Sequence, residues 1–131
     1  MSDTRSHGPR PGAALQTIAM PADVNANGDI FGGWLMAQMD LGASVLARRR
    51  ARGRTATVAV EAMTFLKPVK VGDLVSIHST LTREGRTSMG ISVEVWARRL
   101  DGDTHLKVTE AAFTFVAIDG SGKPRALPAQ D

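Results

Sequence analysis

One stretch constrains the fold of this chain more than any other. The segment from Ile30 to Ala47 is apolar apart from a single charge, Asp40. Its length just reaches that of a membrane-spanning helix, but its glycines and polar residues argue against that interpretation. The pattern predicts instead one helix over about Gly33–Arg50, apolar around most of its circumference. The arginines at its end suit the negative pole of the helix dipole. Such a helix needs cover on most of its sides.

Long strand-like segments follow the predicted helix. They are rich in β-branched and aromatic residues and are separated by short turn sequences. The segments are residues 55–67, 73–84, 88–100 and 104–119, with a shorter strand at 15–20 ahead of the helix. Within the third, alternation places four apolar side chains on one face: Met89, Ile91, Val93 and Val95. The short connections predict an antiparallel meander.

The predicted fold class is therefore α+β, with one long central helix wrapped by a strongly curved antiparallel sheet. Such a sheet keeps one face and its edges exposed, so self-association is expected, most often as a dimer. With 131 residues, the chain has the size of one domain. We predict a single domain over 14–128, between a disordered N-terminal tail at 1–13 and a C-terminal tail at 129–131. Residues 120–131 are interpreted as a turn followed by a loose tail.

Composition narrows the possible functions. The chain has no cysteine, which excludes disulfides and thiolate metal sites, and its first residues contain no apolar run of the secretory type. A cytoplasmic location is expected. The formal net charge of +3 suggests an anionic partner, such as nucleic acid, a membrane surface or a phosphorylated small molecule. Only 5% of the residues are aromatic and none is tyrosine, which is poor material for stacking nucleic-acid bases.

Asp40 has a structural and a functional interpretation. In the first, its carboxylate faces a gap open to solvent or accepts a hydrogen bond from a neighbouring strand. In the second it performs chemistry, and the glycines ahead of it favour this. Gly32 and Gly33 leave backbone N–H groups open at the helix start, where the positive end of the dipole can hold an oxyanion. Tight packing of the helix on the sheet is the other explanation for these glycines.

The spacing of these residues suggests how a site could be assembled. Asp40 lies about 10 Å along the helix from Gly33, too far for both residues of one chain to contact the same atom. A site shared by two chains across a two-fold axis resolves this, with the donors from one chain and the carboxylate from the other. Asn25 and Asn27 precede the glycines, where an amide can orient a water or donate to a carbonyl oxygen. Forming the turn is the alternative role for both asparagines.

Several sequence blocks occur together in a characteristic order: MPADVNANGDIFGGWLMAQMDLGA, TVAVEAMTFLKPVKVGD, GRTS, VEVWARR and TEAAFTFVAIDGSGKPRALP. They resemble the YciA-type acyl-coenzyme A thioesterases of the hotdog-fold superfamily, from about Leu15 to Pro128. The resemblance implies a long helix wrapped in an antiparallel sheet, and dimers that assemble into hexamers with sites at subunit interfaces. It implies hydrolysis of acyl-CoA to a carboxylic acid and free CoA, without a metal or other cofactor. Neither nucleic acid nor a membrane is then expected as a partner.

The resemblance also implies roles for particular residues. Asp40 corresponds to the catalytic carboxylate, Gly32 and Gly33 to the oxyanion donors, and Asn25 to the loop asparagine. One carboxylate and backbone donors suit a thioester, because a thiolate leaves readily without a strong acid. Whether the carboxylate acts as general base or as nucleophile stays open at this point.

Substrate-binding residues are predicted more broadly. CoA carries a 3′-phosphate and a diphosphate, so basic residues are expected near the mouth of the site. The candidates are Asn27, Glu61, Thr64, Lys67, Arg86, Ser88, Lys123 and Arg125. For each basic residue the alternative is a solvated surface charge. Alternation places Glu61 on one face with Ala59, Met63 and Phe65, where it either lies near the site at the interface or makes a structural hydrogen bond.

Other functions fit the sequence less well. Hotdog dehydratases use a histidine with an acid, whereas His7, His78 and His105 all lie outside the predicted helix and its preceding loop. A non-catalytic acyl-CoA sensor is the main alternative, but such a module could dispense with Asp40 and usually carries a DNA-binding element. A nucleic-acid-binding role is suggested by charge alone. The sequence leaves the preferred acyl chain open.

Overall fold

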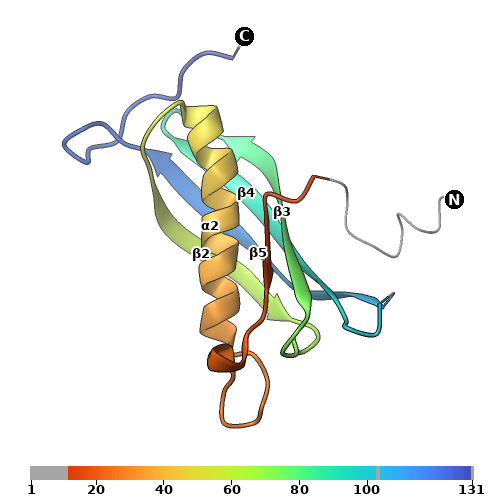
Figure 1. The fold of residues 1–131 in the computed structure, drawn as a ribbon. Helices are drawn as coiled ribbons and strands as arrows, with labels where there is room; N and C mark the ends of the chain where they lie inside the picture. Colours follow the sequence, from red (N-terminus) through yellow and green to blue (C-terminus); the bar gives the residue numbers. More distant parts are fainter. Residues whose placement is uncertain (1–11, 103, 131) are drawn as a thin grey trace, which may run out of the picture.

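The computed structural model describes residues 12–102 and 104–130. Figure 1 shows one long helix, α2, lying along one face of an antiparallel sheet. The elements are β1 Leu15–Ile18, the 3₁₀ turn η1 Pro21–Asp23, α2 Gly32–Ala51, β2 Thr55–Phe65, β3 Leu74–Glu84, β4 Ser88–Arg98 and β5 His105–Ala117. The predicted α+β architecture is confirmed. The predicted helix and strands all form, with ends that differ by a few residues.

The order of the strands in the sheet is β1-β3-β4-β5-β2, so the predicted meander is wrong for β2. β2 pairs with β5 at one edge, whereas β3 pairs with β1 near the other edge. The sequence predicts the turn before β3, but it does not predict the course of the segment between β2 and that turn. After Phe65 the chain leaves the sheet through Pro68, which has no N–H to donate to a ladder. Residues 66–73 therefore cross the molecule.

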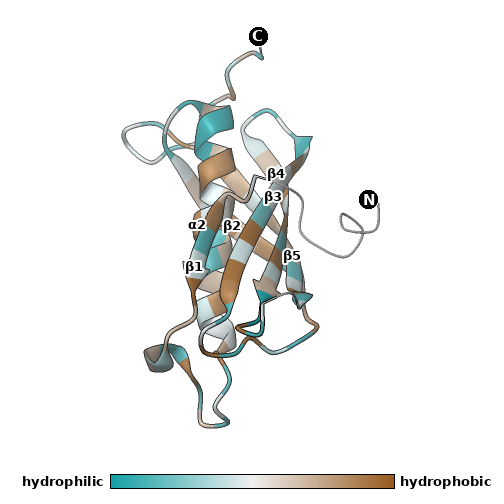
Figure 2. Cartoon of the chain, turned by 45° about the vertical axis from the view of Figure 1, so that its right-hand side comes forward, coloured by the Kyte–Doolittle hydropathy of each residue, from teal (hydrophilic) through white to brown (hydrophobic). Residues whose placement is uncertain are grey.

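The core lies between α2 and the sheet. Met89, Ile91, Val93 and Val95 of β4 are at most 1% exposed, which confirms the face predicted from alternation. The side of α2 that meets them is built from Leu35 and Met39 and from the small residues Gly42, Ala43 and Ala47. Small residues let the helix backbone approach the sheet closely. Figure 2 shows hydrophobic and hydrophilic residues following one another along β3.

Gly42 marks a very close approach of α2 to β3, and we expect Gly42→Ala to destabilise the protein. A Cβ atom at this position would lie 2.5 Å from Cγ2 of Ile77, which is fully buried. Alanine normally stabilises a helix interior relative to glycine, but overpacking here should lower the free energy of unfolding by about 1–3 kcal/mol. Urea denaturation measures the change, with Ser44→Ala on the more open side of α2 as control. Equal midpoints for the two variants would contradict the prediction.

The curved sheet covers one side of α2. Outside the face that packs on the sheet, Met36 is 40% exposed, Leu41 56% and Val45 42%. We call these three residues the apolar stripe. An exposed apolar surface of this kind fits the predicted self-association.

The chain after β5 is tied to the C-terminal end of α2. Arg125 donates to the carbonyl oxygens of Ala51 and Ile118, and Arg50 donates to the carbonyl oxygen of Pro128. Arg50 also forms a two-pronged ion pair with Glu84, and this hydrogen bonding lowers the pKa of the Glu84 carboxyl. The segment from Arg125 to Pro128 is therefore held against the fold and is not loose.

The remaining boundary predictions are not decided by the structure. Of the predicted N-terminal tail, residues 1–11 lie outside the described residues, and the limits of the single domain stay a prediction. No helix in the described ranges is long and apolar enough to cross a membrane.

Candidate active site

The start of α2 presents two backbone donors. The N–H of Phe31 donates to the carbonyl oxygen of Asp23, and the N–H groups of Trp34 and Leu35 reach the carbonyl oxygen of Phe31. Between them, the N–H groups of Gly32 and Gly33 have no acceptor within the described ranges. These two donors lie at the positive end of the helix dipole. They are therefore suited to hold a negatively charged oxygen.

The two glycines differ in their surroundings. A Cβ atom on Gly32 would lie 3.1 Å from Cζ of Phe65, so close packing explains a glycine there. A Cβ atom on Gly33 would meet only the ring of Phe31, at an ordinary contact distance of 3.5 Å. Packing alone does not require a glycine at position 33. Gly33 is thus the better candidate for a glycine that leaves room for a ligand.

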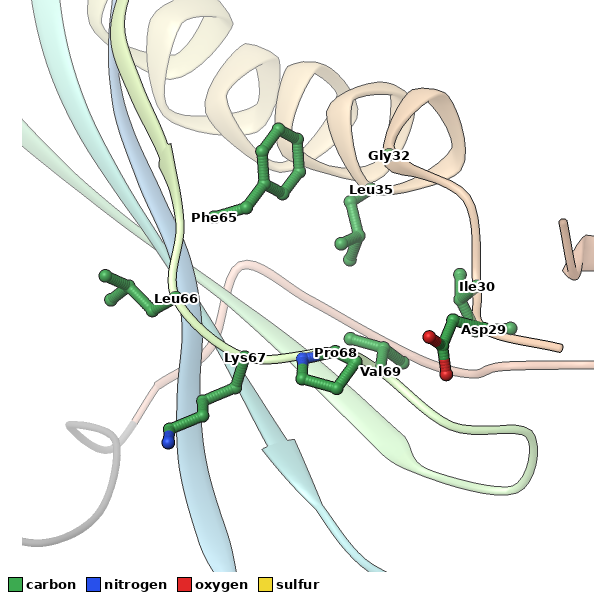
Figure 3. Close-up of a pocket in the computed structure, with 9 residues that line it drawn as sticks. All are labelled: Asp29, Ile30, Gly32, Leu35, Phe65, Leu66, Lys67, Pro68 and Val69. Carbon is green, nitrogen blue, oxygen red and sulfur yellow. The ribbon is translucent and has the colours of Figure 1, made fainter. Parts of the chain in front are cut away.

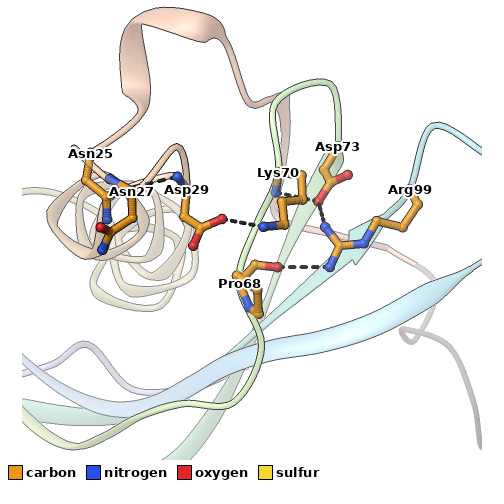
Figure 4. A network of polar contacts seen from close by, with 7 residues as sticks. All are labelled: Asn25, Asn27, Asp29, Pro68, Lys70, Asp73 and Arg99. Atoms are coloured by element: carbon orange, nitrogen blue, oxygen red, sulfur yellow. Dashed lines mark hydrogen bonds and ion pairs between the residues drawn. The ribbon is translucent and has the colours of Figure 1, made fainter.

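The loop before α2 is organised by Asn25. Its Oδ1 accepts hydrogen bonds from the N–H groups of Asn27 (2.9 Å) and Asp29 (3.2 Å), and Figure 4 shows the three residues together. The turn-forming role considered for Asn25 is therefore present. Its Nδ2 has no partner in the part of the chain that the structure describes, so the amide retains a donor for a ligand. Asn27 takes part through its backbone.

Asp40 is half-buried and is held by a threonine of β2. Oγ1 of Thr57 donates to Oδ1 of Asp40 over 2.6 Å. The carboxylate opens onto a groove of about 370 Å³ between α2 and β2, lined by Gly33, Met36, Ala37, Asp40, Thr57, Val60 and Phe113. The hydrogen bond from a neighbouring strand, foreseen in the structural interpretation, thus coexists with access from the groove. Gly33 and Asp40 lie along the same groove, two helical turns apart.

Thr57 is a site residue that the sequence did not reveal. Its position in the strand was predicted, but its contact with Asp40 depends on how far β2 is shifted along α2. We expect Thr57→Val, which keeps the shape and removes the donor, to lower kcat for thioester hydrolysis by roughly 10- to 100-fold, the loss of a hydrogen bond to a charged group. Steady-state kinetics measure this, with Thr55→Val in the same strand as control. Equal kcat values for the two variants would argue against a role for the bond.

A second hollow, of about 470 Å³, lies at the start of α2. It is lined by Asp29, Ile30, Gly32, Leu35, Phe65, Leu66, Lys67, Pro68 and Val69. In Figure 3, Phe65 projects toward the start of α2, whereas the ammonium group of Lys67 points away from it. The structure therefore brings Lys67, among the predicted basic residues, to the same end of the molecule as the two glycine donors.

Glu61 and Thr64 lie exposed on β2. The predicted alternation of Glu61 with Met63 and Phe65 is wrong, because the pairing with β5 shifts between Glu61 and Thr64 and Ala62 adopts a positive φ of 52°. A bulge of this kind turns the following side chains to other directions. The carbonyl oxygen of Thr64 accepts a hydrogen bond from Thr109.

The other candidates lie at the opposite end of α2, a helix of 20 residues and thus about 30 Å long. Arg86 is in the turn between β3 and β4, and Ser88 opens β4. Lys123 and Arg125 belong to the segment after β5, where Arg125 binds the last carbonyl of α2. Within one chain the structure does not bring these four residues to the glycine donors.

Comparison with known proteins settles the family. Residues 27–101 match the family model of the thioesterase superfamily. The chain belongs to this family. It is 52% identical to the acyl-CoA thioester hydrolase YciA of Escherichia coli (strain K12), over 93% of this chain and 95% of that protein. The resemblance found in the sequence is confirmed. The predicted enzyme class, thioester hydrolase, is confirmed with it.

Two solved structures show the same fold in the thioesterase family. A hexameric thioesterase from Yersinia pestis superposes with a TM-score of 0.88 at 52% identity, covering 93% of this chain and 99% of that one. A hexameric broad specificity acyl-coenzyme A thioesterase, in a variant with an aspartate replaced by alanine, also gives a TM-score of 0.88, at 46% identity. That match covers 93% of this chain and 90% of the other. The hotdog fold is thereby confirmed, whereas the roles of individual residues remain predictions.

Proposed function

We propose that this protein hydrolyses acyl-CoA to a carboxylic acid and free CoA, with Asp40 as the catalytic carboxylate. One observation carries the proposal. A carboxylate fixed by Thr57 opens onto an apolar groove that also contains Gly33, whose N–H has no acceptor within the described chain. The names of the relatives, acyl-CoA thioester hydrolases and thioesterases, support the same substrate class.

The arrangement of Thr57, Asp40 and Gly33 supports general base catalysis, with direct attack by the Asp40 carboxylate as the alternative. Thr57 occupies Oδ1 of Asp40, which leaves Oδ2 to take a proton from a water as the water oxygen attacks the thioester carbonyl carbon. The Gly33 N–H donates to the carbonyl oxygen as it becomes an oxyanion. Collapse of this intermediate breaks the C–S bond and releases the CoA thiolate, which needs no strong acid. No cofactor takes part, and CoA enters only as part of the substrate.

The complete site is proposed to be shared by two chains. Gly33 and Asp40 of one chain are separated by about 10 Å along α2, and the outer edge of β2 is available for pairing with another strand. Antiparallel pairing of two β2 strands across a two-fold axis would set the start of one α2 beside Asp40 of the other chain. It would also bring the end that carries Arg86, Ser88 and Lys123 toward Lys67 of the partner. The hexameric relatives support self-association.

Mixing two inactive variants tests the shared site. Asp40→Asn subunits and Gly33→Pro subunits are unfolded together in equal amounts, refolded and assayed. A shared site predicts that mixed dimers regain one intact site, or about one quarter of wild-type turnover under random pairing. A site built within one chain predicts only the sum of the two parent activities. Each variant refolded alone is the control.

The substrate class is tested with a panel of acyl-CoAs that carry short, long and aromatic acyl groups. Met36, Ala37, Val60 and Phe113 give the groove apolar walls, so an acyl chain is expected to lie there rather than the CoA nucleotide. Release of free thiol reports hydrolysis. The alternative function, a sensor that binds acyl-CoA without cleaving it, predicts tight binding with no thiol release.

A further inference from the structure

The connection between β2 and β3, residues 66–73, forms a wall of the larger hollow without regular secondary structure. Leu66, Lys67, Pro68 and Val69 all line that hollow. The position of such a wall decides how a ligand fits, and an irregular segment has no ladder of its own to fix it. Backbone hydrogen bonds hold its ends, from Leu66 and Lys67 to Val108 and from Gly72 to Ala19. Charged side chains hold its middle part at two further places.

Arg99, directly after β4, contacts the wall at two points. Its Nη1 donates to Oδ2 of Asp73 over 2.5 Å, and its Nη2 donates to the carbonyl oxygen of Pro68 over 3.0 Å. Asp73 is only 1% exposed, and its Oδ2 also accepts the N–H of Lys70 at 2.8 Å. The rigid fork of a guanidinium can hold two acceptors in fixed relation. Arg99 thus ties Pro68 to Asp73.

Lys70 ties the same wall to the loop ahead of α2. Its ammonium group pairs with Asp29, and beside it the N–H of Ile30 donates to the carbonyl oxygen of Val69 over 3.1 Å. The N–H of Asp29 is in turn bound by Asn25. Figure 4 shows the continuous chain of contacts from Asn25 through Asp29, Lys70 and Asp73 to Arg99.

We propose that Lys70 and Arg99 are positioning residues for acyl-CoA hydrolysis. Arg99 fixes the wall of the hollow, and Lys70 holds the loop with Asn25, and hence the start of α2, against that wall. Neither side chain lines the groove of Asp40 or the larger hollow, so both act through other residues. The inference rests on the proposed function, because it takes the hollow and the helix start as parts of the substrate site.

The Lys70–Asp29 pair allows a test that leaves the fold intact. The two side chains are 52% and 32% exposed, and pairs of this kind contribute little to stability. We expect Lys70→Met and Asp29→Asn each to lower kcat on the order of tenfold, less than the roughly 10²-fold cost of a 1 Å misplacement. The double variant should be no slower than either single variant, because both remove the same contact. The exchanged pair, Asp29→Lys with Lys70→Asp, should recover part of the loss.

Arg99→Lys tests the other contact. Lysine keeps a positive charge beside the buried carboxylate of Asp73. It has no second N–H group placed to reach the carbonyl oxygen of Pro68, so the wall loses that contact. We expect KM for acyl-CoA to rise about tenfold with a smaller change in kcat. The matched control is Lys107→Met, since Lys107 is also paired with carboxylates, Glu94 and Glu110, but lies on β5 away from both hollows. Its kinetic constants should stay at wild-type values.

The kinetic constants are expressed per folded molecule, with the folded fraction taken from circular dichroism. This inference would be overturned if Lys70→Met, Asp29→Asn and Arg99→Lys all kept wild-type kcat and KM. If Asp40→Asn were inactive in the same experiment, the proposed function would still stand. An active Asp40→Asn would instead overturn the proposed function. Additive losses in the double variant would also overturn the coupling through Lys70.

Discussion

Asp40→Asn is expected to lower kcat for acyl-CoA hydrolysis by about 10²- to 10⁴-fold, the usual contribution of a positioned general base or acid. Asparagine has the same size, and its Oδ1 can still accept the hydrogen bond from Thr57. The fold and the binding of CoA should therefore persist, while the group that takes a proton or attacks the substrate is gone. Thiol release measures turnover, and isothermal titration with CoA measures binding.

The control for this variant is Asp101→Asn, which neutralises an exposed carboxylate in the turn between β4 and β5. It should hydrolyse acyl-CoA at the wild-type rate. Turnover by Asp40→Asn close to that of this control would end the assignment of Asp40. Loss of CoA binding together with turnover would point instead to a structural role.

The same residue separates two mechanisms. A general base leaves the carboxylate of Asp40 chemically unchanged, whereas a nucleophile forms an anhydride that water then opens. Single turnover in ¹⁸O-water, followed by mass spectrometry of the peptide that contains Asp40, distinguishes them. Label in that peptide would exclude a reaction that proceeds only by general base catalysis.

Gly33→Pro is expected to lower kcat by about 10²- to 10³-fold, the usual cost of losing one oxyanion donor. Proline removes the N–H and is tolerated in the first turn of a helix, where no intrahelical hydrogen bond is lost. A Cβ atom at this position meets only the ring of Phe31, at 3.5 Å. Gly32 is less suited to such a substitution, because its Cβ would press on Phe65.

Gly33→Ala is the matched control, since it adds the Cβ atom and keeps the N–H. It should retain most of the turnover. Equal losses in the alanine and proline variants would show that space rather than the donor matters at this position. Thermal melting of both variants checks that the start of α2 still forms.

The sequence predicted those features that depend on local pattern. Alternation placed Met89, Ile91, Val93 and Val95 on the buried face, because a strand that covers a core repeats every two residues. The isolated charge of Asp40 likewise predicted a hydrogen-bond partner or access to solvent, since a buried carboxylate needs one of them. The resemblance to a family then supplied the expected fold.

Features that depend on distant contacts could not be predicted in this way. β2 pairs with β5 because residues 66–73 lead the chain away from β2 before β3 begins. No residue pattern in that segment indicates where in the sheet β3 will pair. The hydrogen bond between Thr57 and Asp40 depends on how far β2 is shifted along α2, which local sequence patterns do not determine. Ala62 adopts a left-handed conformation that is usual for glycine, so its residue type gave no sign of the bulge.

The apolar stripe on α2 has a consequence for behaviour on dilution. Met36 belongs both to the stripe and to the lining of the Asp40 groove, so the proposed association of chains would cover both together. Subunit association, thermal stability and turnover are then linked by mass action. Specific activity and melting temperature should fall together as the protein concentration drops, unlike those of an enzyme whose site is complete in one chain.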